Sequence, residues 1–187
     1  MNKVLVIIDM QNDFIDGSLG TPEAQAIVDK VCDKIREYKS NQWDIVYTRD
    51  THTENYLNTP EGLNLPVKHC IYQTEGWELN KKIQSALVES GWAYIDWFNK
   101  FTFGSQKLVK HFVEEYCDYN QPIDEIELVG LCTDICVISN AIMLKNAFYD
   151  KFVTITVDAS CCAGVTPEKH KAALEVMKSC QINVINE

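Results

Sequence analysis

The chain has 187 residues, 46% of them hydrophobic, and a formal net charge of −10 from 17 basic and 27 acidic residues. Its length and apolar content suit one domain with a sizeable core, covering 1–187. The acidic balance, without a cluster of lysine and arginine, argues against nucleic acid and against anionic membranes as partners. The amino-terminal apolar run is too short for a signal peptide or a membrane span, so we expect a cytoplasmic protein whose eight cysteines are mostly reduced and buried.

Segments of strand type and helix type alternate along the chain. The first, at 3–9, is β-branched and apolar throughout, which is typical of a strand buried on both faces of a parallel sheet. Thr-Pro-Glu occurs at 21–23 and again at 166–168, where a capping residue, a proline and an acid together indicate the start of a helix. Strands are expected at 3–9, 43–48, 93–97, 125–131, 152–157 and 182–185. Helices are expected at 21–38, 78–89, 105–117, 134–148 and 166–179.

Six strands alternating with helices predict a doubly wound α/β fold, a three-layer α/β/α sandwich around a six-stranded, mainly parallel sheet. Ligands bind to such sheets beyond the carboxyl ends of the strands, where the winding reverses. In the strand order 3-2-1-4-5-6, the first and fourth strands are neighbours at that reversal. Asp9 ends the first strand and Cys136 follows the fourth, so we expect both to face one crevice, with Lys100 just after the third strand.

Cys136 lies where an apolar strand turns into an apolar helix. The first turn of a helix offers unpaired N–H groups and a positive dipole end, which stabilise a thiolate and can hold an oxyanion. A carboxylate can accept the thiol proton and an ammonium can stabilise the anion, which are roles that Asp9 and Lys100 would fill. Cys136 alone is explained equally well as a buried free cysteine, whereas Asp9 and Lys100 alone are better explained as a turn-capping carboxylate and a solvated lysine. Only their convergence favours catalysis.

The stretch 50–77 is polar and irregular, and a loop of this length in a compact domain is usually functional. Asp50 and His52 alternate on an extended segment, so their side chains point the same way. Downstream, Glu61 and His69 add a second carboxylate and a second imidazole. Mixed nitrogen and oxygen ligation suits Zn²⁺, Fe²⁺ or Mn²⁺ better than Ca²⁺ or Mg²⁺. The spacing by itself favours a solvated acidic loop with two surface histidines over a metal site.

Four segments resemble, in their order and spacing, those of the isochorismatase-like cysteine hydrolases: Ile8-Asp9-Met-Gln-Asn-Asp-Phe14, Asp50-Thr-His52, Lys100 and Gly130-Leu-Cys-Thr-Asp-Ile-Cys136. The resemblance covers nearly the whole chain. Within this superfamily, an Asp-x-His followed by a further ligand and a late histidine before cysteine resembles nicotinamidases, the zinc- or iron-type amidases that also hydrolyse pyrazinamide. The resemblance implies a hydrolase of linear amide C–N bonds that converts nicotinamide into nicotinate and ammonia in NAD salvage.

The resemblance also implies a mechanism. Asp9 would take the thiol proton of Cys136, Lys100 would hold the resulting ion pair, and the thiolate would attack the carboxamide carbon. Ammonia would leave, and water would hydrolyse the thioester. The oxyanion would bind the backbone N–H groups of Cys132 and Cys136, with a cis peptide bond between Leu131 and Cys132.

One divalent metal ion and no organic cofactor are implied in the same way. Its ligands would be Asp50, His52, Glu61 and His69, with Glu54 as the alternative third ligand. Zinc is the first expectation, and iron and manganese are the alternatives. The ion would orient the substrate by binding its pyridine nitrogen.

Phe14, Trp97 and Phe103 fall where this family places aromatic residues that sandwich the substrate ring, although ordinary core packing is the alternative for each. The expected partner is therefore a small aromatic carboxamide, and the family adds the expectation of a homo-oligomer. Two other functions stay open. One is a metal-free cysteine amidase acting on an N-carbamoyl or ureido compound, and the other is a non-catalytic binding protein. Isochorismate hydrolysis is disfavoured because enzymes with that activity generally lack the nucleophilic cysteine.

Overall fold

A six-stranded parallel sheet, in the order β3-β2-β1-β4-β5-β6, forms the centre of the molecule. The computed structural model describes residues 2–89, 91, 93–116 and 123–187. Its strands are β1 (Lys3–Ile8), β2 (Asp44–Asp50), β3 (Ile95–Lys100), β4 (Glu125–Leu131), β5 (Thr154–Ala163) and β6 (Asn183–Ile185). The doubly wound topology predicted from the sequence is confirmed, and the strand order is the one in which the first and fourth strands are neighbours.

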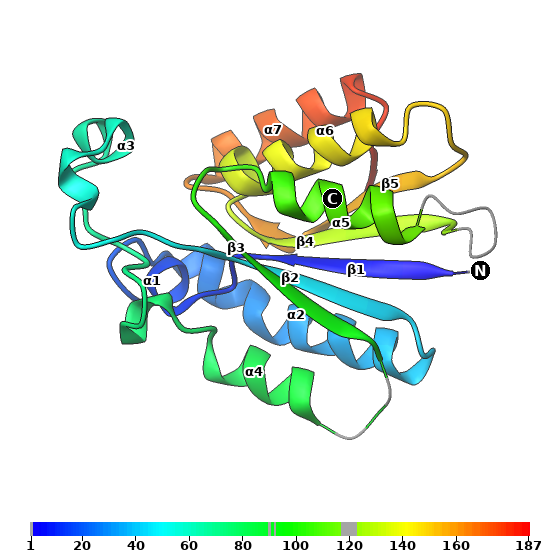
Figure 1. Ribbon diagram of the computed structural model, residues 1–187, viewed down its shortest axis with the longest axis horizontal. Coiled ribbons are helices and arrows are strands. Elements are labelled where there is room, and N and C mark those ends of the chain that lie inside the picture. The colour runs from blue at the N-terminus through cyan, green and yellow to red at the C-terminus, as the bar shows by residue number, and fades with distance from the viewer. Residues whose placement is uncertain (1, 90, 92, 117–122) are drawn as a thin grey trace.

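Helices cover both faces of this sheet and complete the three layers (Figure 1). They are α1 (Asn12–Ile15), α2 (Pro22–Ser40), α3 (Pro60–Asn64), α4 (Lys81–Val88), α5 (Gln106–Tyr116), α6 (Ile138–Ala147) and α7 (Pro167–Ser179). One face is covered by α2 and α4, and the other by α5, α6 and α7. The short helices α1 and α3 lie at the end of the sheet where the strands finish.

The position of β1 between two hydrophobic cores explains why its sequence is apolar throughout. Leu5 and Ile7 belong to the core on the α2 side, whereas Val4, Val6 and Ile8 belong to the core on the α6 side. Each of these five side chains is at most 2% exposed. Full burial of such a side chain stabilises the fold by about 1.5–3 kcal/mol, so a strand in this position needs apolar residues on both faces.

Several element boundaries differ from the sequence prediction. The third strand begins at Ile95 and continues to Lys100, so the segment 98–100 is strand and not turn. Its polar residues are compatible with a strand because this end of the sheet borders a buried polar site. The fifth strand runs past 157 to Ala163, after a shift in its register with β4. The helix expected from 134 begins with a separate π-helical turn, Thr133–Val137.

Other predicted features follow the expected pattern. The side chain of Thr21 accepts a hydrogen bond from the N–H of Ala24 and Thr166 accepts one from Lys169, so both predicted helix starts are confirmed. A third Thr-Pro-Glu, at 59–61, starts α3 in the same way. Cys117, the last residue of the helix predicted at 105–117, lies outside the described residues. The seven cysteines within them are unpaired, and five are buried. None of the helices in the described ranges has both the length and the apolar character needed to cross a membrane.

Candidate active site

The structure brings the three predicted catalytic residues together around one ammonium group. Asp9 follows β1 with a φ of 49°, Lys100 ends β3, and Cys136 lies in the turn after β4. The Nζ atom of Lys100 lies 2.7 Å from an oxygen of Asp9 and 3.4 Å from the Sγ atom of Cys136. A second carboxylate, Asp50, lies 3.0 Å from the same Nζ. All four side chains are buried.

Burial and charge act in opposite directions on these groups. Burial raises the pKa of Asp9 and of the Cys136 thiol, and the positive charge of Lys100 opposes both shifts. Burial alone would lower the pKa of Lys100, but Asp9, Cys136 and Asp50 outweigh it and hold that pKa well above its usual value. Lys100 therefore stays charged, the resting thiol keeps its proton, and Asp9 is a stronger base than an exposed aspartate.

Two buried residues for which the sequence predicted no role hold the carboxylates in place. The hydroxyl of Thr48 donates to Oδ1 of Asp9 at 2.7 Å and accepts the N–H of Asp9 at 3.3 Å. The side chain of Gln11 accepts the N–H of Asp50 at 2.7 Å and donates to the carbonyls of Asp50 and Trp77 at 2.9 and 2.8 Å. Gln11 could have been found as a glutamine only two residues after Asp9, next to a fully apolar strand. A threonine within a strand carries no comparable signal.

The backbone around the nucleophile has the expected cis peptide bond between Leu131 and Cys132. The carbonyl oxygen of Cys132 then accepts the N–H groups of Ile135 and Val137 at 3.0 and 3.1 Å. Cys136 thus sits inside one tight turn that precedes α6. Cys132 and Cys136 line the same cavity, and the role of their N–H groups as an oxyanion hole stays a prediction.

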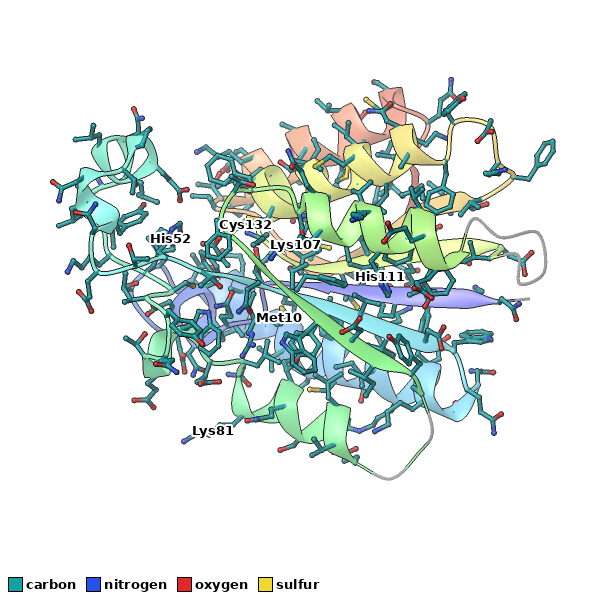
Figure 2. The ribbon with its side chains drawn as sticks, in the orientation of Figure 1. Met10, His52, Lys81, Lys107, His111 and Cys132 are labelled. Carbon is teal, nitrogen blue, oxygen red and sulfur yellow. The ribbon has the colours of Figure 1, made fainter. Side chains whose placement is uncertain are left out.

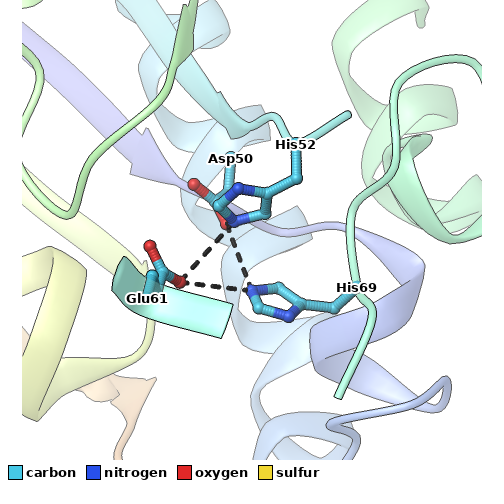
Figure 3. A group of neighbouring side chains, drawn as sticks. All are labelled: Asp50, His52, Glu61 and His69. Atoms are coloured by element: carbon cyan, nitrogen blue, oxygen red, sulfur yellow. Dashed lines mark ion pairs between the residues drawn. The ribbon is translucent and has the colours of Figure 1, made fainter. Parts of the chain in front are cut away.

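Beside this triad, four predicted ligands form a compact cluster (Figure 3). The members, which offer one ligand atom each, are Asp50, His52, Glu61 and His69. These atoms all lie within 4.8 Å of one another. Oδ2 of Asp50 lies 2.9 Å from Nε2 of His52 and 3.5 Å from Nε2 of His69. Oε1 of Glu61 lies 3.6 and 3.7 Å from the same two nitrogens.

The donor atoms of this cluster fit a divalent cation. Nδ1 of His69 lies 2.9 Å from the carbonyl oxygen of Val67, a contact that places the ring proton there and leaves the Nε2 lone pair facing the cluster. Nε2 of His52 is buried, and although it lies close to Asp50, it makes no hydrogen bond of acceptable geometry within the described residues. This is expected of an atom that faces an ion. Two imidazole nitrogens and two carboxylate oxygens suit Zn²⁺, Fe²⁺ or Mn²⁺.

The structure also separates the two candidates for the third ligand. The side chain of Glu54 is 77% exposed and forms an ion pair with Lys68 at 2.8 Å, whereas Glu61, from α3, lies in the cluster.

Tyr56, for which the sequence predicted no role, is fully buried and packs against both imidazole rings, with its ring centroid 4.6 Å from that of His52 and 4.9 Å from that of His69. In Figure 2, His52 from the loop after β2 and Cys132 from the end of β4 lie at the same end of the sheet.

A cavity of about 250 Å³ connects the thiol with the cluster. Cys136, Cys132, Asp50, Glu61, His69 and Phe14 are among the residues that line it. Phe14 is 8% exposed, and its ring centroid lies 5.5 Å from that of His69. Phe103 lines the cavity as well. Its mixture of apolar walls with few polar groups is typical of a small-molecule site.

The predicted placement of Trp97 against the substrate ring is contradicted. Its side chain is 52% exposed, does not line the cavity, and stacks on Tyr47 of β2 with ring centroids 6.2 Å apart. The reason is strand alternation, because residues separated by an odd number point to opposite faces of a sheet. Lys100 points into the site, so Trp97, three positions earlier on β3, points away from it.

Comparison with known proteins gives consistent matches over the whole chain. The isochorismatase domain family matches residues 3–187. The nicotinamidase/pyrazinamidase of Mycobacterium tuberculosis is 25% identical over 193 residues, which cover 98% of each chain. Among solved structures, the nicotinamidase/pyrazinamidase PncA from Bacillus subtilis superposes with a TM-score of 0.77 at 26% identity, covering 100% of both chains. The pyrazinamidase of Pyrococcus horikoshii in complex with zinc gives 0.76 at 26% identity, also covering 100% of both chains.

Proposed function

Because the chain belongs to the isochorismatase domain family, we propose that it is an amidase that hydrolyses nicotinamide to nicotinate and ammonia, as in NAD salvage, and pyrazinamide in the same way. The observation that carries this proposal is one cavity with a nucleophile at one wall and a nitrogen- and oxygen-rich cluster at another. A pyridine carboxamide has a reactive group and a ring nitrogen to match these two walls. Relatives named nicotinamidase or pyrazinamidase support the same substrate class.

In this mechanism Asp9 accepts the thiol proton of Cys136, and the new thiolate lies within reach of the Lys100 ammonium. The thiolate attacks the amide carbon and forms a C–S bond. The oxyanion is held by the N–H groups of Cys132 and Cys136. Asp9 returns the proton to the amide nitrogen, and ammonia leaves as the C–N bond breaks. Water, deprotonated by Asp9, then attacks the thioester, releases the acid and restores the thiol.

The other groups in the cavity orient the substrate ring. Asp50, His52, Glu61 and His69 would hold the divalent ion, which when bound supplies a Lewis-acidic contact for the ring nitrogen. Phe14, which is buried, and Phe103 both line the cavity and offer an apolar surface to the ring. With its ring held in this way, the substrate presents its carboxamide to Cys136.

The first experiment measures ammonia release from nicotinamide by purified protein, with metal content determined on the same sample before and after chelation. We expect release that falls after chelation and returns on addition of Zn²⁺, Fe²⁺ or Mn²⁺. Cys136→Ala should lose turnover but keep its fold and its metal. Turnover that survives in Cys136→Ala would rule out this residue as the nucleophile.

A matched pair of variants tests the ligand set. Glu61→Gln should bind metal less tightly than wild type, whereas Glu54→Gln, which alters an exposed residue of the same loop, should bind it equally well. Equal metal content in both variants would remove Glu61 from the cluster. If metal-loaded wild type releases no ammonia from nicotinamide but does so from an N-carbamoyl or ureido amide, the function is that of the alternative substrate class.

A further inference from the structure

One buried side chain on α6 fastens the loop between β3 and α5. Asn140 is fully buried, and its Nδ2 atom donates to the carbonyl of Phe103 at 3.2 Å and to the carbonyl of Cys136 at 2.8 Å. Its Oδ1 atom accepts the N–H of Ser105 at 2.9 Å. Three of the four hydrogen bonds that an asparagine amide can form are therefore made. A single side chain thus links the backbone of the nucleophile to both ends of the segment 103–105.

The loop lies directly against α6 at the same place. A Cβ atom on Gly104 would collide with the sulfur of Met143 and would lie 3.6 Å from Cβ of Ser139. Thr102 closes the loop by donating from its hydroxyl to the carbonyl of Gly104 at 2.7 Å. Ser105 directly precedes α5, and its Oγ atom accepts a hydrogen bond from the N–H of Leu108 at 3.1 Å. The backbone of this loop is thereby located relative to α6 by contacts on several sides.

Phe103 needs such support because its surroundings do not hold it. Its side chain lines the cavity but is 48% exposed. A ring with half of its surface in solvent is not confined by packing, so its position depends on its backbone. Asn140 supplies that restraint, and it does so from the same helix that follows Cys136.

We propose that Asn140 is a positioning residue that fixes Phe103 relative to the thiol of Cys136, so that an aromatic ring packed on Phe103 presents its reactive group to the sulfur. This inference rests on the proposed function in taking the ring to belong to the substrate. Asn140 contacts the carbonyl of Cys136, whereas the thiol itself contacts Lys100. The residue should therefore govern recognition of the ring and leave the ionisation of the thiol unchanged.

The test uses Asn140→Thr and a control on the same helix. A threonine hydroxyl can still donate to the carbonyl four residues earlier, that of Cys136, but it is too short to reach the loop. The control, Ser139→Ala, removes the hydrogen bond from Ser139 to the carbonyl of Ile135 at 2.6 Å and no hydrogen bond to the loop. Asn140→Ser, which is uncharged, can still donate to the carbonyl of Cys136 and cannot reach the loop, replaces Asn140→Thr if that variant does not fold.

We expect KM for nicotinamide to rise about tenfold in Asn140→Thr, the loss of one good aromatic contact, with a smaller change in kcat. The pH profile of Cys136 alkylation by iodoacetamide should not move. Ser139→Ala should match wild type in both. In a Phe103→Ala background, Asn140→Thr should add almost nothing, because the group that it positions is gone. Effects that multiply across the two sites, or an alkylation profile that shifts, would overturn the proposal.

A second readout does not require turnover. Alkylation of Cys136 by iodoacetanilide, which carries a ring, is compared with alkylation by iodoacetamide, which does not, and the modified peptide is quantified by mass spectrometry. The ratio of the two rates should fall in Asn140→Thr and stay unchanged in Ser139→Ala. A fall in this ratio, in a protein that does not hydrolyse nicotinamide, would refute the proposed function and support the positioning role. An unchanged ratio would refute the positioning role alone.

Discussion

Replacing Lys100 with methionine tests whether its charge compensates the buried carboxylates. Lys100 is 3% exposed and lies 2.7 Å from Asp9 and 3.0 Å from Asp50, both of which are buried. Methionine has a similar volume and no charge. Removing one partner of a buried ion pair costs about 3–5 kcal/mol, because the other charge is left without compensation. In a chain of this length, each kcal/mol lowers Tm by about 2–4 °C, so we expect Tm to fall by about 6–20 °C.

The stability defect of Lys100→Met should also depend on pH. Burial already raises the pKa of Asp9 while Lys100 opposes that shift, so removing Lys100 raises the pKa further. Between the ordinary pKa of aspartate and this raised value, the folded variant binds a proton that the unfolded chain does not bind. Its stability therefore falls as the pH rises through this window. The defect relative to wild type should be larger at about pH 8 than at about pH 5.

Urea unfolding of the metal-free proteins at both pH values measures this effect. The comparison includes wild type, Lys100→Met, Asp9→Asn and the double variant. Since Asp9→Asn removes one of the uncompensated charges, the double variant should recover part of the stability lost in Lys100→Met. A Lys100→Met variant as stable as wild type, or equally destabilised at both pH values, would refute the compensating role of this ammonium.

Three other positions give independent predictions. Burial lowers the pKa of His170 from 6.5, so protonation of this imidazole is less favourable in the folded protein than in the unfolded chain. The stability of wild type should therefore decline as the pH falls below about 6.5. In urea titrations this decline should be steeper for wild type than for His170→Gln. Gly130 has a φ of 117°, and a Cβ atom there would collide with the carbonyl oxygen of Ile8, so Gly130→Ala should lower the free energy of unfolding by on the order of 3–5 kcal/mol in the same assay. Trp97→Ala should leave KM for nicotinamide within about twofold of wild type, as a surface substitution would. A larger increase in KM would instead support the contact between Trp97 and the substrate ring that the resemblance implies.

The sheet could be predicted because its determinants are local. The run from Val4 to Ile8 is apolar on both faces, and the Thr-Pro-Glu segments at 21–23 and 166–168 mark helix starts with side-chain caps. The third strand was placed too early because Asn99 and Lys100 are polar, and polarity normally indicates a turn. In the folded chain the Lys100 side chain is neutralised by carboxylates from β1 and β2, a contact that no local pattern records.

The same distinction applies to the site. Asp9 and Cys136 could be predicted because they mark the ends of adjacent strands, whereas the assignment of Glu61 depended on a resemblance. Asn140 was not found because the loop groups that it binds, the carbonyl of Phe103 and the N–H of Ser105, lie far away in the sequence. Trp97 was placed against the substrate ring by the resemblance alone, and the face to which its side chain points is known only once the strand includes Lys100.

Asp50 joins the two halves of the site, because one oxygen faces Lys100 at 3.0 Å while the other faces the imidazoles of His52 and His69. Its charge raises the pKa of the Cys136 thiol. Asp50→Asn should therefore reduce metal binding and also, in metal-free protein, shift the alkylation profile of Cys136 to lower pH.

Glu61 provides the contrast, because its ion-pair contacts in the cluster are with the two imidazoles. Glu61→Gln should reduce metal binding and leave the alkylation profile in place. If both variants shift the profile equally, the thiol responds to the net charge of the whole cluster. If neither does, the link through Asp50 is wrong, and the nucleophile and the metal cluster are electrostatically independent. Only a shift confined to Asp50→Asn agrees with one carboxylate that serves both.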